Sequence, residues 1–139
     1  MSYQRINPIP QFNFQANRVL TYGKLACREQ EIEEEIPKIR TFDDWDTVWL
    51  SLAKKAESEN RYLHAAYYGR MAEFFLTPNH PQKDILYRRC LRNFYLGFDS
   101  ELHLNYKRYR VPFENGALNC ISIPSPHSKG TILVCGGYD

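Results

Sequence analysis

The side chains able to act as nucleophiles or metal ligands are scattered along this 139-residue chain. Its cysteines, Cys27, Cys90, Cys120 and Cys135, include no C-x-x-C pair and have no histidine at metal-ligand spacing, so we expect no metal site. None of the seven serines lies in a G-x-S-x-G motif. Cys135 has no adjacent histidine or basic residue to favour its thiolate. We therefore expect neither a nucleophile nor a bound cofactor within these residues, and reduced thiols.

Charge is nearly balanced overall but unevenly distributed. Lys and Arg total 18 and Asp and Glu total 16, a net charge of +2 that gives no support to nucleic-acid binding. Residues 29–59 hold ten acidic and four basic side chains, whereas residues 83–110 hold seven basic and three acidic ones. The basic stretch, interleaved with tyrosines, is compatible with single-stranded nucleic acid. We favour the simpler interpretation that the two stretches pair with each other, within one chain or across a dimer.

Apolar residues up to Gly97 recur at helical spacing and predict about four helices. Residues 1–16 are expected to form an extended arm, and residues 17–98 a helical segment whose first helix is capped by Asn17. Thr41 and Asp44 resemble a capping box at the start of the clearest helix. Further helices are expected from about residue 61 to Thr77 and from Pro81 to a stop at Gly97. The acidic run at residues 29–35 is expected to be a solvated face.

The pattern after Gly97 favours three strands. Alternation at residues 102–106 predicts a half-buried strand, and a turn at Glu114-Asn115-Gly116 precedes a second strand at residues 117–123. The third, at residues 131–135, is apolar throughout and is followed by Gly136-Gly137. Such a strand belongs in a sheet covered on both faces, which four helices and three strands cannot supply. We therefore expect the front portion of a larger α/β protein, with residues 99–139 forming an incomplete sheet.

Several of these segments together resemble a known family. The segment from Trp45 to Phe75, with W-x-x-x-W and the run A-A-Y-Y-G-R-M-A-E-F-F, is similar to the helical N-terminal part of α/β-hydrolases of the fermentation-respiration-switch-like, pseudooxynicotine hydrolase and polyketide-shortening groups. V-P-F-E at residues 111–114 resembles their first hairpin. T-I-L-V-C-G-G-Y-D at residues 131–139 resembles their third strand and oxyanion loop.

The resemblance implies a serine hydrolase that cleaves an ester, amide or activated C–C bond of a small acyl or carbonyl substrate. A backbone N–H of Gly137 or Tyr138 would stabilise the developing oxyanion. Tyr67, Tyr68 and Phe75 are candidates for the substrate pocket, although core packing explains most of the aromatic residues. The nucleophile, acid and histidine would lie beyond Asp139, so the 139 residues alone are expected to be an inactive, truncated α/β-hydrolase.

One alternative is a non-enzymatic helical module that binds a partner protein and associates through the strand at residues 131–135. For either function we expect a homodimer or association through that strand, with no nucleic acid and no membrane as a partner. No apolar run approaches the length that spans a bilayer, and the first residues lack the features of a signal peptide. These features favour the cytoplasm.

Overall fold

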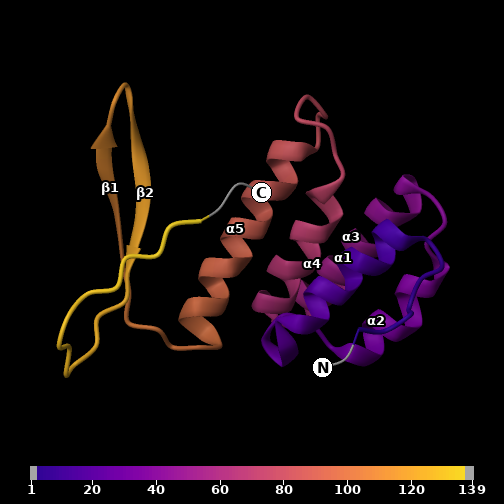
Figure 1. Ribbon diagram of the computed structural model, residues 1–139, viewed down its shortest axis with the longest axis horizontal. Coiled ribbons are helices and arrows are strands. Elements are labelled where there is room, and N and C mark those ends of the chain that lie inside the picture. The colour runs from indigo at the N-terminus through magenta and orange to yellow at the C-terminus, as the bar shows by residue number, and fades with distance from the viewer. Residues whose placement is uncertain (1–2, 137–139) are drawn as a thin grey trace. The chain divides into compact units, whose positions relative to one another are not determined.

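The computed structural model describes residues 3–136, in which five α-helices precede a two-stranded antiparallel hairpin (Figure 1). The helices are α1 (Pro10–Thr21), α2 (Glu29–Glu35), α3 (Phe42–Ser58), α4 (Tyr62–Phe74) and α5 (Lys83–Ser100), with short 3₁₀ turns η1 (Gly23–Leu25) and η2 (Ile36–Lys38). The hairpin comprises β1 (Lys107–Phe113) and β2 (Gly116–Ser122). The chain divides into a helical unit that ends at Leu102 and a second unit that begins at His103.

The first helix begins earlier than the sequence predicts. Residues 10–16, expected in the extended arm, are the first turns of α1, because Pro10 occupies a first-turn position and Phe12 and Ala16 lie on its buried face. Asn17 lies inside this helix and does not cap it. Its side-chain oxygen accepts a hydrogen bond from the Gln4 N–H at 2.8 Å, which ties the preceding segment to α1.

The capping box predicted for α3 is confirmed. The Thr41 hydroxyl accepts a hydrogen bond from the Asp44 N–H at 3.1 Å, and the Asp44 carboxylate accepts one from the Thr41 N–H at 2.9 Å. The other end of α3 is closed by Asn60, whose φ of 57° lies in the left-handed region that asparagine tolerates better than most residues. Local sequence signals therefore set both ends of this helix.

The predicted stop of the last helix at Gly97 is wrong, because α5 continues to Ser100. Gly97 is buried where α5 meets α4, and a Cβ atom there would lie 2.6 Å from the Cδ2 atom of Leu63. The missing side chain thus permits a close approach between two helices rather than ending one. Helix α4 packs against both α3 and α5, and Figure 1 shows it between them.

The core of the helical unit is aromatic, as the sequence analysis anticipated for most of these residues. Trp45 and Trp49 of α3 are fully buried, and the Phe12 ring of α1 stacks on Trp45 at 5.2 Å between ring centroids. Phe75, at the end of α4, contacts the same Trp45 ring edge-on at 5.1 Å. These contacts join α1, α3 and α4 around one apolar cluster.

The described residues of the second unit contain two strands, and the expected count of three is wrong. The predicted first strand at residues 102–106 is not part of the sheet; β1 begins at Lys107 and pairs with β2 from Lys107 opposite Ser122 to Phe113 opposite Gly116. The turn residues are Glu114 and Asn115. Glu114 has a φ of 48°, the conformation that a two-residue hairpin turn of the primed type requires at its first position.

The predicted third strand at residues 131–135 is likewise absent from the described structure. Its residues carry no strand assignment, and Ile132, Leu133 and Val134 are 89%, 87% and 85% exposed. Strand formation requires a neighbour that accepts and donates backbone hydrogen bonds, and the described sheet contains only β1 and β2. The segment is therefore unpaired within the described sheet, and its apolar side chains are uncovered. The expectation that Cys135 ends a buried strand is wrong too, because Cys135 is exposed.

Candidate functional site

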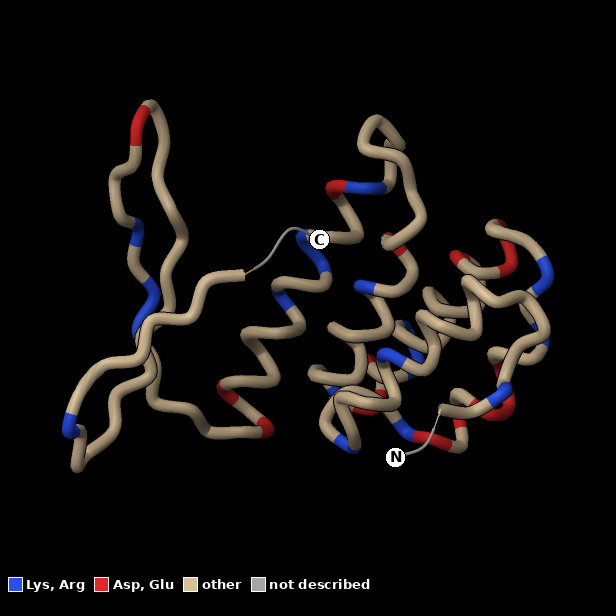
Figure 2. Tube along the Cα trace, viewed as in Figure 1, with Lys and Arg blue, Asp and Glu red and all other residues tan. Residues whose placement is uncertain are grey.

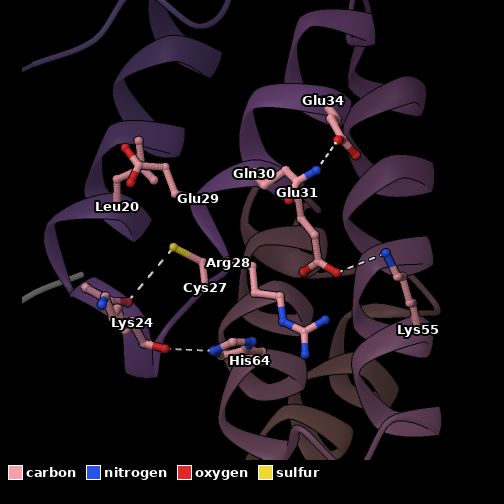
Figure 3. Close-up of a pocket in the computed structure, with 11 residues that line it drawn as sticks. Leu20, Lys24, Cys27, Arg28, Glu29, Gln30, Glu31, Glu34, Lys55 and His64 are labelled. Carbon is pink, nitrogen blue, oxygen red and sulfur yellow. Dashed lines mark hydrogen bonds and ion pairs between the residues drawn. The ribbon is translucent and has the colours of Figure 1, made fainter.

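A cavity of about 520 Å³ opens in the helical unit where η1, α2, α3 and α4 come together (Figure 3). One part of its wall is apolar and includes Leu20 and Cys27. Burial, followed by the nearby acidic residues Glu29 and Glu31, raises the pKa of the Cys27 thiol to about 11. That thiol is therefore protonated at neutral pH and is not an activated nucleophile.

The polar part of the wall is built on Glu31, which is 5% exposed. Its Oε1 lies 3.0 Å from the Lys55 ammonium and 2.9 Å from the Arg61 guanidinium, and its Oε2 accepts a hydrogen bond from the Tyr68 hydroxyl at 2.8 Å. Burial alone raises the pKa of Glu31, but the hydrogen bonds from Lys55 and Tyr68 and the charge of Arg61 together bring it below its ordinary value. Glu31 is thus an ionised carboxylate with its lone pairs occupied.

Two further residues extend this network toward the surface. Glu59, next to the end of α3, accepts a hydrogen bond from the Arg61 Nε–H at 2.7 Å and lies 3.0 Å from the guanidinium of Arg28. The Arg28 N–H in turn donates to the Tyr68 hydroxyl at 3.0 Å. These contacts connect the start of α2, the end of α3 and helix α4 at one side of the cavity.

His64 of α4 contributes a neutral ring to the cavity wall. Its Nε2 lies 2.8 Å from the Lys24 carbonyl oxygen, so Nε2 carries the proton and donates it to that oxygen. Its Nδ1 lies 2.5 Å from the Arg61 guanidinium and accepts a hydrogen bond from it. Burial, reinforced by the positive charge of Arg61, lowers the pKa of His64 despite the favourable Lys24 carbonyl. These two contacts hold its ring in place.

The three pocket candidates from the sequence do not meet at this cavity. Tyr68 is fully buried and its hydroxyl donates a hydrogen bond to Glu31, so it stabilises a lining residue without itself lining the cavity. Tyr67 is partly buried and its ring lies 5.4 Å from that of Tyr22, while Phe75 belongs to the aromatic core. Their role as substrate-pocket residues remains a prediction. Gly137 and Tyr138, the oxyanion candidates, lie outside the described residues.

The acidic and basic stretches do meet within the helical unit. Glu57 of α3 forms an ion pair with Arg89 of α5 and lies 3.5 Å from the guanidinium of Arg92. Hydrogen bonds from Arg89 and Asn93 lower the pKa of Glu57 and outweigh its burial, which acts in the opposite direction. Pairing of these stretches within one chain is thus realised at this position.

Sequence reasoning missed Glu31. The acidic run was interpreted as a solvated face, and Figure 2 shows acidic residues following one another along α2, yet Glu31 and Ile32 of that helix are buried. Ile32 has a glutamate on each side, and only Glu31 is buried while Glu33 is exposed, so the isoleucine did not identify Glu31. Nothing in the sequence indicated that Lys55, Arg61 and Tyr68 would converge on it.

Among the described residues, no group of three or more His, Cys, Asp or Glu side chains is arranged to hold a metal ion. No helix in the described part of the chain has the length and apolar character needed to cross a bilayer. Comparison of the chain with protein-family models and with curated proteins finds no match in either set.

Proposed function

We propose that these residues are the N-terminal part of a serine α/β-hydrolase, with the helical unit as its cap-like segment and residues 103–139 as the beginning of its catalytic sheet. The complete protein would hydrolyse an ester, amide or activated C–C bond of a small acyl or carbonyl substrate. A backbone N–H of Gly137 or Tyr138 would stabilise the oxyanion.

The observation that carries this proposal is the exposure of Ile132, Leu133 and Val134, each 85% exposed or more. Exposing apolar surface to water is unfavourable by about 25 cal/mol for every Å², so three adjacent branched side chains favour a covered state. A strand apolar on both faces is typical of a parallel sheet with helices on each side. The order of elements, helices first and a hairpin next, is also the order that the resemblance implies.

The experiment compares the 139-residue chain with the longer polypeptide produced when translation continues past codon 139. We expect the longer polypeptide to contain G-x-S-x-G, an acid and a histidine, to hydrolyse a p-nitrophenyl ester and to react with a fluorophosphonate. The 139-residue chain should do neither, because it lacks the nucleophile. The matched control replaces the serine of that motif by alanine. An inert longer polypeptide, or turnover by the short chain, would exclude the proposal.

The same exposed segment favours a second candidate, a non-enzymatic module that adds residues 131–135 as a strand to a partner's sheet. Replacing Leu133 by lysine discriminates the two candidates. The module would lose its partner, measured as a smaller mass in solution, with no hydrolytic activity to lose. For the hydrolase the same change disrupts the sheet of the longer polypeptide and abolishes esterase activity.

A further inference from the structure

The β1–β2 hairpin has one apolar face and one mostly polar face. Successive residues of a strand project to opposite sides of the sheet, and residues that pair across the two strands share a side. The register therefore places on one face Tyr109, Val111, Phe113, Leu118 and Cys120, with Lys107 and Ser122 at its open end. The other face carries Arg108, Arg110, Pro112, Ala117, Asn119 and Ile121. The hairpin is thus amphipathic.

The apolar face is largely open to solvent. Its four largest apolar side chains, those of Tyr109, Val111, Phe113 and Leu118, are between 41% and 56% exposed. A hairpin of two strands is at best marginally stable in water unless a further strand or a packing partner covers its apolar face. The described sheet contains no third strand. The amphipathic pattern therefore indicates a partner that covers this face.

The two ends of the apolar face carry opposite charges. Lys107 lies at the open end of the hairpin, and Glu114 lies in the turn at the other end. A strand rises about 3.3 Å per residue, so these two positions are separated by about 20 Å. Lys107 and Glu114 of one hairpin are too far apart to pair with each other. They can pair when a second hairpin lies over the first in the reverse direction.

We propose that two copies of this chain form a dimer by packing the apolar faces of their hairpins together, with the turn of one hairpin over the open end of the other. This two-fold arrangement pairs Lys107 of each copy with Glu114 of the second copy. Placing both turns at the same end would bring like charges together, which is unfavourable. A second copy fits because the face is complementary to itself in charge and in apolar character.

The dimer goes beyond the proposed function, because its interface makes no use of a hydrolytic site. A face made of two seven-residue strands is smaller than a standard interface, so we expect a weak dimer whose population depends on protein concentration. Sedimentation of the 139-residue chain measures it. The mass should rise from that of one chain, 16.4 kDa, toward twice that value. A chain that stays monomeric up to about 1 mM would overturn the proposal.

Two substitutions on the same strand identify the face. Leu118→Lys places a charge in the apolar face and should abolish the dimer. The matched control is Ile121→Lys, which changes an equally apolar, exposed residue on the opposite face and should leave the dimer intact. Circular dichroism verifies the folding of both variants. Equal effects of the two substitutions would overturn the assignment of the interface to the apolar face.

A charge exchange tests the direction of packing without changing the apolar face. Lys107→Glu and Glu114→Lys each remove two symmetry-related ion pairs, and a surface pair is worth up to about fivefold, so each should weaken the dimer by up to about 25-fold. The double variant restores opposite charges across the interface and should return to within about twofold of the original affinity. A double variant as weak as the single ones would overturn the reversed arrangement.

Leu133→Lys separates this dimer from association through residues 131–135. The hairpin dimer should survive that substitution, because Leu133 lies outside β1 and β2. A mass that falls with Leu133→Lys but not with Leu118→Lys would assign the association to residues 131–135 and overturn the hairpin dimer. The esterase activity of the longer polypeptide is a separate readout, so failure of the dimer and failure of the proposed hydrolase are distinguishable.

Discussion

Replacing Glu31 by glutamine should destabilise the helical unit more than any other single charge removal in its acidic helix. The Glu31 side chain is 6% exposed and faces Arg61, whose side chain is 11% exposed. Breaking a buried ion pair costs about 3–5 kcal/mol, because the remaining charge is left uncompensated. Arg61 keeps Glu59 as a partner at 2.7 Å and the Lys55 side chain is 52% exposed, so we expect the lower end, about 3 kcal/mol.

Urea denaturation followed by tryptophan fluorescence measures this loss, because Trp45 and Trp49 are both buried in the helical unit. The matched control is Glu33→Gln on the same helix, an exposed residue whose loss should change the free energy of unfolding by less than about 0.5 kcal/mol. Equal effects of the two substitutions would refute the inference that Glu31 is the centre of a buried network.

The pH dependence provides an independent check of the same network. The pKa of Glu31 is lower in the folded chain than in the unfolded one, because hydrogen bonds and Arg61 outweigh its burial. The unfolded state therefore binds a proton first as pH falls, and the stabilisation is present above the unfolded pKa of about 4.5 and lost below it. We expect the wild-type chain to lose this contribution in acid and Glu31→Gln to have none to lose.

Three further predictions concern the helices. His64 has a lowered pKa from burial and the charge of Arg61, so the free energy of unfolding should fall as pH drops from about 6.5; His64→Asn should reduce this slope between pH 7.5 and 5 in urea titrations. Gly97→Ala should cost about 1–2 kcal/mol, since overpacking against Leu63 exceeds the gain in helix propensity; the cost should shrink when Leu63→Ala is also present, and a cost unchanged in that background would contradict the contact. Thr41→Ala should lower the free energy of unfolding by about 1 kcal/mol through loss of the cap, and an unchanged denaturation midpoint would show that the cap is dispensable.

Local sequence signals were sufficient to predict a structural feature wherever a side chain interacts with the backbone of its own short segment. The capping box at Thr41 and the left-handed closure at Asn60 delimit α3 within a short stretch of chain, and the turn before Gly116 joins two strands that are adjacent in sequence. In each case the interacting groups are only a few residues apart, so pattern and propensity determine the outcome.

Contacts between distant residues were beyond the reach of sequence patterns. A glycine at the end of an apolar helical pattern favours a helix stop, but Gly97 instead permits the close approach of α5 to Leu63. Which of the two roles a glycine has depends on the helix that lies opposite it. The strand pattern at residues 131–135 is present in the sequence, yet a strand forms only where a second strand pairs with it.

The sequence by itself determined that helices precede a hairpin, that most aromatic residues form a core and where the hairpin turns, because periodicity and turn chemistry are local properties. Only the tertiary structure decided that Glu31, in a run of glutamates, is the one that Arg61 and Tyr68 reach, and that a cavity lies beside it. Burial of a single charge depends on partners thirty or more residues away, and no pattern along the chain specifies their meeting.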